Sequence, residues 1–147
     1  MRKKGFMTIG YGNMNINSFI NRLVENRVNC IVDVRTRPYS QFNVSYNKEE
    51  LRSRLAEHNI SYFWYGNKLG GRYDKIALCN SQGIVDYDKV KNTDKFKEGL
   101  KELLELCDMY NVCVMCSEKE PMRCHRFLLI SRELKEYNIY HIMPEAT

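Results

Sequence analysis

The sequence predicts an α/β fold, a three-layer Rossmann-like domain with a mostly parallel five-stranded sheet. Three observations lead to this prediction. Short β-rich segments alternate with segments of helical periodicity along the chain, as in doubly wound folds. Residues 30–34 are almost continuously apolar, like a strand covered on both faces of a parallel sheet. The 147 residues contain no internal repeat or linker, so we expect one domain over residues 1–147.

The first half of the chain is predicted to form three strands separated by two helices. The strands are residues 6–9, 30–34 and 60–65, which are rich in β-branched and aromatic residues. Apolar residues at helical spacing indicate the first helix. Its predicted inner face consists of Ile16, Phe19, Ile20, Leu23 and Val24.

The ends of the second helix are predicted from capping residues. Asn47 and Glu50 have the spacing of an N-cap and its reciprocal partner. Leu51 and Leu55 form the inner face, and Asn59 is the expected C-cap.

The second half of the chain begins with a long segment without clear periodicity, residues 66–92, and such segments are usually functional or mobile. Two strands follow, residues 112–116 and 139–143. Each strand is preceded by a helix with apolar residues at helical spacing. These residues are Phe96, Leu100, Leu103, Leu104 and Cys107 in the third helix, and Phe127, Ile130, Leu134 and Tyr137 in the fourth. The order of the strands in the sheet is left open.

Composition limits the location and the partners of the protein. No apolar segment approaches the ~20 residues that span a bilayer, and the stretch that follows Met1 breaks at Gly10, too early for a signal peptide. We therefore expect a cytoplasmic protein with no membrane partner and with free thiols at its six cysteines. The net charge, 23 − 18 = +5, permits a phosphate-bearing small molecule or a nucleic acid as partner but does not require one.

The unusual polar residues fall after the predicted strands. Ligands of open parallel sheets bind outside the carboxyl ends of the strands, so we predict the functional site at that edge. The segments concerned are Gly10–Gly12, Asp33–Ser40, Leu69–Arg72 and Cys116–Arg126.

The predicted catalytic residues group around two cysteines. Cys116 lies at the end of a strand, and Cys124 falls in the first turn of the next helix, where free N–H groups and the helix dipole favour a thiolate or a bound anion. Basic neighbours should lower the pKa of Cys124 further, which makes it the candidate nucleophile. His125, Glu118 and Asp33 are candidate acids or bases. Alternatively, both thiols are small buried fillers and Glu118 is a solvated charge.

Arginines at the same edge are the predicted anion ligands, because guanidinium groups bind phosphate in bidentate fashion. Asp33 and Arg35 could instead form a structural ion pair. Glycines there would let the backbone approach a ligand. The predicted ligand-binding residues are Gly10, Tyr11, Gly12, Arg35, Arg37, Ser40, Gly70, Gly71, Arg72 and Arg126.

A zinc site is the alternative to the thiol chemistry. Cys116, Cys124 and His125 could supply three ligands, but a structural zinc site needs four, usually including a close Cys pair. Cys113 and Cys116 have C-x-x-C spacing, yet residues three apart on a strand point to opposite faces. We therefore predict no metal, and the sequence identifies no cofactor.

These motifs together resemble the DUF488 family, a family of uncharacterised bacterial and archaeal proteins. The resemblance covers nearly the whole chain and implies an α/β domain, but it supplies no established reaction. The matching motifs are Thr8-Ile9-Gly10-Tyr11, Asp33-Val34-Arg35, Pro38-Tyr39-Ser40, Leu69-Gly70-Gly71 and Cys116-x-Glu118-x-x-Pro121-x-x-Cys124-His125-Arg126.

Two functions remain open from the sequence. The first is an enzyme that acts on a phosphate-bearing ligand, a nucleotide or a nucleic acid, with a Cys/His/Arg site at the carboxyl edge of the sheet. The second is a non-enzymatic nucleic-acid-binding or regulatory module that uses the arginines of that edge.

We predict that Cys124 is the most reactive thiol of the chain. Cys107 and Cys113 have apolar neighbours and positions inside a helix and a strand, so burial should raise the pKa of both thiols. Alkylation with iodoacetamide at several pH values, with the labelled sites assigned by mass spectrometry, measures the rates. Equal labelling of Cys124 and Cys107 near neutral pH would contradict the prediction.

Overall fold

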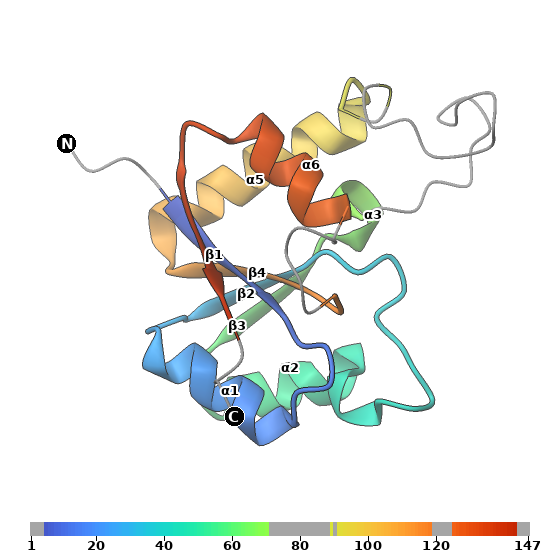
Figure 1. Ribbon diagram of the computed structural model, residues 1–147, viewed down its shortest axis with the longest axis vertical. Coiled ribbons are helices and arrows are strands. Elements are labelled where there is room, and N and C mark those ends of the chain that lie inside the picture. The colour runs from blue at the N-terminus through green and yellow to red at the C-terminus, as the bar shows by residue number, and fades with distance from the viewer. Residues whose placement is uncertain (1–4, 71–88, 90, 119–124, 144–147) are drawn as a thin grey trace.

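The protein folds as a parallel sheet with helices on both faces (Figure 1). A computed structural model describes residues 5–70, 89, 91–118 and 125–143, with the backbone alone for residues 125, 126 and 128. The strands are β1 (Gly5–Gly10), β2 (Cys30–Asp33), β3 (Ser61–Trp64), β4 (Val112–Cys116) and β5 (Asn138–Ile142). The helices are α1 (Ile16–Glu25), α2 (Lys48–Ala56), α3 (Gly66–Leu69), α5 (Asp94–Met109) and α6 (His125–Glu133), with a short 3₁₀ helix, η1 (Val44–Tyr46).

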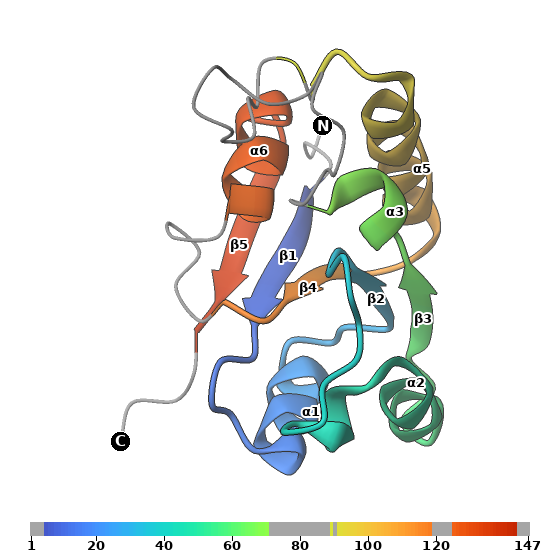
Figure 2. The ribbon, with the colours of Figure 1, turned by 90° about the vertical axis from the view of Figure 1, so that its right-hand side faces the viewer.

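The strands lie in the order β3-β2-β4-β1-β5, and every neighbouring pair is parallel. Helices α1 and α2 cover one face of the sheet, and α3, α5 and α6 cover the other (Figures 1 and 2). This arrangement confirms the predicted three-layer α/β fold and supplies the strand order.

Each face of the sheet has its own hydrophobic core. Phe19 of α1 and Leu51 of α2 pack with Ile31 on one face, and Phe96 and Phe127 pack on the other face. Alternate residues of a strand point to opposite faces, so the sheet contributes to both cores. The same rule separates the two cysteines of the C-x-x-C segment. As predicted, Cys113 and Cys116 point to opposite faces: Cys113 lies in the core with Phe19, and Cys116 lies in the core with Phe96.

Three details of α1 and α2 differ from the predictions. Val24 is half exposed, because at 100° per residue it lies about 90° from the centre of the buried stripe of α1. Asn47 precedes α2 as expected, but its side chain makes no capping bond. Its Oδ1 instead accepts a hydrogen bond from the backbone N–H of Ser40 at 2.6 Å. The C-cap of α2 is Glu57, and Asn59 follows with the positive φ of 60° on which the C-cap prediction rested.

Gly66, the first residue of α3, lies against the backbone that follows β2. A Cβ at this position would lie 1.8 Å from the carbonyl oxygen of Arg35 and 2.5 Å from Nε1 of Trp64. Because neither a backbone carbonyl nor a hydrogen-bonded indole yields easily, only glycine fits there.

We predict that Gly66→Ala destabilises the protein by about 2–3 kcal/mol, since the backbone must shift to make room. Gly99→Ala in α5 is the control. Its Cβ would meet only side-chain atoms of Leu69 and Lys68 at 2.8–2.9 Å, and alanine gains about 1 kcal/mol of helix propensity over glycine. We therefore expect a clearly smaller loss for Gly99→Ala in urea unfolding followed by circular dichroism. Equal losses for the two variants would contradict the prediction.

Candidate functional site

The strand register brings most of the described candidate residues to one edge of the sheet. Gly10, at the end of β1, is opposite Cys116, at the end of β4. Asp33, at the end of β2, is opposite Met115 of β4. Cys30, at the start of β2, lies at the other end of the sheet, opposite Val112.

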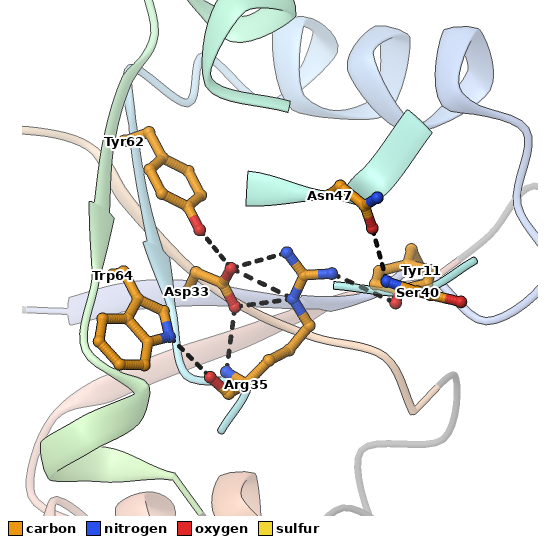
Figure 3. A network of polar contacts seen from close by, with 7 residues as sticks. All are labelled: Tyr11, Asp33, Arg35, Ser40, Asn47, Tyr62 and Trp64. Carbon is orange, nitrogen blue, oxygen red and sulfur yellow. Dashed lines mark hydrogen bonds and ion pairs between the residues drawn. The ribbon is translucent and has the colours of Figure 1, made fainter. Parts of the chain in front are cut away.

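A buried ion pair occupies the end of β2 (Figure 3). The Asp33 carboxylate is fully buried, and Arg35 is only 5% exposed. Asp33 accepts hydrogen bonds from the backbone N–H of Arg35 at 3.0 Å, from its Nε at 3.0 Å and from its Nη2 at 2.8 Å. The hydroxyl of Tyr62, from β3, donates a further hydrogen bond to Asp33. Both carboxylate oxygens are therefore occupied by donors.

Aromatic residues from three segments enclose the pair. The Arg35 guanidinium donates to the Tyr11 hydroxyl at 3.4 Å and lies 5.6 Å from the centre of that ring. Tyr11 stacks on Tyr46 of η1, with the ring centres 4.0 Å apart. Trp64, at the end of β3, donates from Nε1 to the carbonyl oxygen of Arg35 at 2.8 Å. The segment after β2 is thus fixed from both sides.

The protonation of this network follows from its burial and its charges. Burial alone would lower the pKa of Arg35, but hydrogen bonding to Asp33 and the negative charge of Asp33 outweigh it and raise that pKa. Burial and the negative charge of Asp33 raise the pKa of Tyr62, so its hydroxyl stays protonated and donates. A general-base role for Asp33 would require one of its donors to leave, and that role stays a prediction.

A pocket of about 370 Å³ opens beside the ion pair. We call it the switch-point pocket, because it lies where two neighbouring strands end and the segments after them turn to opposite faces of the sheet. β2 leads to α2 on one face of the sheet, and β3 leads to α3 on the other (Figure 2). Open α/β sheets bind their ligands in such crevices. The pocket is lined by Thr36, Arg37, Pro38, Tyr39, Lys48 and Trp64.

Two cations, Arg37 and Lys48, and an aromatic wall formed by Trp64 and Tyr39 define the chemistry of this pocket. The ammonium of Lys48 lies 5.1 Å from the centre of the Trp64 ring, within the range of a cation–π interaction. Arg37 is exposed. Within residues 5–70, 91–118 and 125–143, neither Lys48 nor Arg37 forms an ion pair. Among the described residues, neither charge is therefore neutralised by a carboxylate.

Several predicted ligand-binding residues have structural contacts here. The Ser40 hydroxyl accepts hydrogen bonds from the backbone N–H groups of Phe42 and Asn43 at 3.1 and 3.2 Å. Gly12 has a φ of 50°, and its backbone N–H donates to the backbone carbonyl oxygen of Ser117 at 3.0 Å. A Cβ at Gly70 would lie 2.6 Å from Oγ1 of Thr36. These contacts shape the edge, and ligand contacts of the same residues stay predictions.

A family model matches most of the chain. The family model described as "Domain of unknown function DUF488" matches residues 15–132. The chain belongs to the DUF488 family. Neither a curated protein nor a solved structure gave a significant match. In the part of this DUF488 chain that the structure describes, no helix is long and apolar enough to cross a membrane.

The cysteines of this DUF488 protein differ in their surroundings. Burial, and secondarily the neighbouring Cys107, raises the pKa of the Cys30 thiol to about 12, and burial and Cys30 raise that of Cys113. Both are therefore poor nucleophiles near neutral pH. The Cys116 thiol is buried and lies 3.7 Å from the carbonyl oxygen of Glu118.

Some candidate residues lie outside the described residues. They are Gly71, Arg72 and Cys124, together with the side chains of His125 and Arg126. Among the side chains that are described, no three His, Cys, Asp or Glu residues gather as a metal site requires.

The predicted site residues did not include Thr36, Lys48 or Trp64, although Thr36 lies in the segment Asp33–Ser40 that was predicted at this edge. A usable signal was present in the chain between Asp33 and Glu49. That stretch contains three basic residues and no acidic one, which indicates a segment suited to an anion.

We predict that Asp33→Asn destabilises this DUF488 protein by about 3–5 kcal/mol, because it leaves the buried charge of Arg35 without a partner. Tyr62→Phe is the matched control. It removes one donor from the same carboxylate and should cost about 1 kcal/mol. Urea unfolding followed by circular dichroism measures both. If Asp33→Asn costs no more than Tyr62→Phe, the ion pair does not organise this edge.

Proposed function

We propose that this DUF488 protein binds a phosphate-bearing ligand, a nucleotide or a nucleic acid, in the switch-point pocket. One observation carries the proposal. Arg37 and Lys48, which form no ion pair with any described residue, line the same pocket as Trp64, and Lys48 lies over the indole ring.

The pocket offers one set of partners for the phosphate of such a ligand and another for its base. Arg37 can bind a phosphate through two parallel hydrogen bonds, and Lys48 supplies a point charge. The faces of Trp64 and Tyr39 can stack on a base, because every base has a π face. A volume of about 370 Å³ falls among the ~300–1,000 Å³ of small-molecule sites.

The buried ion pair supports this binding indirectly. Arg35 is engaged by Asp33, and its carbonyl oxygen holds the indole N–H of Trp64 at 2.8 Å. We therefore assign Arg35 as a positioning residue that orients the aromatic wall, rather than as a phosphate ligand. An aromatic wall that is oriented before binding loses less entropy when the ligand arrives.

An enzymatic role is the second candidate, and the position of Cys116 favours it. This cysteine ends β4, which neighbours β2, and its carbonyl oxygen accepts from the backbone N–H of Tyr11 at 3.1 Å. The chemistry would come from the predicted catalytic set of Cys116, Cys124, His125, Glu118 and Asp33. A thiol that reacts with the ligand should be protected from iodoacetamide when the ligand is bound. A binding module should show no such protection.

We predict that Arg37→Ala and Lys48→Ala each weaken binding of adenosine monophosphate about tenfold or more, because each removes a charge-assisted hydrogen bond. Quenching of the fluorescence of Trp64, the only tryptophan in the sequence, reports binding to the wild type. Isothermal titration calorimetry compares the affinities of the variants. Lys101→Ala is the control, because it removes the same charge from an exposed position on α5.

Two outcomes would overturn the proposed function. One is that neither adenosine monophosphate nor inorganic phosphate binds the wild type more tightly than it binds the Arg37 and Lys48 variants. The other is that Lys101→Ala weakens binding as much as they do, which would indicate a general effect of charge.

A further inference from the structure

The segment that leads away from the switch-point pocket exposes an unusual amount of apolar surface. Tyr39 is 61% exposed, Phe42 85% and Val44 53%. We call residues 39–44 the aromatic segment. Tyr39 also lines the pocket, so the pocket and the aromatic segment form one continuous surface. Contiguous exposed apolar side chains beside a pocket usually indicate a binding surface.

The aromatic segment is held in place at both ends. At its start, the backbone N–H of Ser40 donates to Asn47 Oδ1 at 2.6 Å. The Ser40 hydroxyl accepts from the backbone N–H groups of Phe42 and Asn43. Just beyond its end, Tyr46 is buried, stacks on Tyr11 and donates to the carbonyl oxygen of Met14. The segment is thus fixed by its own polar groups while its apolar side chains point outward.

The charged side chains among the residues that line the pocket and the aromatic segment are both positive. Arg37 and Lys48 lie in the pocket, and the chain from residue 34 to residue 48 contains no acidic residue. The carboxylate of Asp33 is buried and paired with Arg35. Glu49 and Glu50 are exposed in the first turn of α2 and would repel a polyanion there. An anionic chain that leaves the pocket is therefore directed over residues 39–44 rather than along α2.

We infer that the ligand of the switch-point pocket is a single-stranded nucleic acid, which enters the pocket with one nucleotide and continues over the aromatic segment. This inference rests on the proposed function and names its substrate class. Proteins that bind single strands combine cations that contact the backbone with aromatic rings on which the bases stack. Here Arg37 and Lys48 contact phosphates, and the rings of Tyr39 and Phe42 stack on successive bases.

The same combination argues against the other partners that bind exposed apolar residues. A partner protein with an apolar surface would have to bury the charges of Arg37 and Lys48, which is costly without paired carboxylates. A duplex keeps its bases stacked inside the helix, so Phe42 could not stack on them. An unpaired strand offers phosphates and free base faces in succession, which matches a pocket that continues into the aromatic segment.

The test compares a short and a long ligand. Thymidine monophosphate probes the pocket alone, and a fluorescein-labelled oligothymidylate of about eight nucleotides, within the ~4–16 nucleotides that single-strand-binding folds cover, probes pocket and segment together. We expect Phe42→Ala to weaken binding of the oligonucleotide about tenfold, the effect of losing one stacked base, and to leave thymidine monophosphate unaffected. Fluorescence anisotropy measures the oligonucleotide, and calorimetry measures the mononucleotide.

Two controls accompany this comparison. Met109→Ala removes an apolar side chain of α5 that is 67% exposed, and it should change neither binding. The labelled oligonucleotide annealed to its complement should bind the wild type more weakly than the free strand. Because Phe42 is 85% exposed, its replacement should not alter the stability of the fold.

Each outcome separates this inference from the proposed function. If thymidine monophosphate binds but the oligonucleotide binds no more tightly, or if Phe42→Ala leaves oligonucleotide binding unchanged, the single-strand inference is wrong and the proposed function stands. If neither ligand binds, the single-strand inference is wrong, and the titrations with adenosine monophosphate and inorganic phosphate decide the proposed function. If Phe42→Ala instead abolishes association with lipid vesicles or self-association in ultracentrifugation, the aromatic segment serves a membrane or a protein, and the inference is overturned.

Discussion

The buried ion pair between Asp33 and Arg35 determines the shape of the carboxyl edge of the sheet. Taking both charges out of water costs several kcal/mol per ion, which is recovered only when good geometry and further hydrogen bonds satisfy them. Here Asp33 receives donors from Arg35 and from the Tyr62 hydroxyl. The carbonyl oxygen of Arg35 then binds Trp64, and Gly66 packs against that same carbonyl. The pair therefore fixes the end of β2 together with the turn that follows β3.

The strand order explains why a pocket lies next to this pair. After β2 the chain turns towards α2, and after β3 it turns towards α3 on the opposite face. Two neighbouring strands whose following segments separate in this way leave a crevice between those segments. Because Asp33 already neutralises Arg35, the crevice takes its positive charge from Arg37 and Lys48. A structural Arg35 and a pocket lined by two other cations are thus compatible at neighbouring positions.

The sequence predicted the five strands and the helices α1, α2, α5 and α6 because their patterns are local, but it missed the short α3 and η1. The apolar run of β2 and the helical spacing of Phe19 and Leu23 are direct consequences of burial. It did not predict the strand order, which depends on how helices far apart in the chain pack on the sheet. It also missed Lys48, because the pocket joins the start of α2 to the end of β3. The i, i+2 spacing of Asp33 and Arg35 indicated a shared face of the strand but not how deeply the ion pair is buried.

The distance between the pocket and the cysteine of β4 limits what kind of ligand could use both. The pocket lies between β3 and β2, and Cys116 ends the next strand, β4. Adjacent strands are about 4.8 Å apart, and the Cys116 thiol lies in the core on the α5/α6 face, whereas Trp64 packs against the core on the α1/α2 face. Arg35 and Tyr11 lie on this edge together and contact each other. An inorganic phosphate held by Arg37 could not extend over that separation, whereas a nucleotide has a second group at the far end of its sugar. If the thiol side of this edge performs chemistry, its substrate is therefore a ligand longer than one phosphate, and the requirement agrees with the aromatic wall that Trp64 and Tyr39 provide.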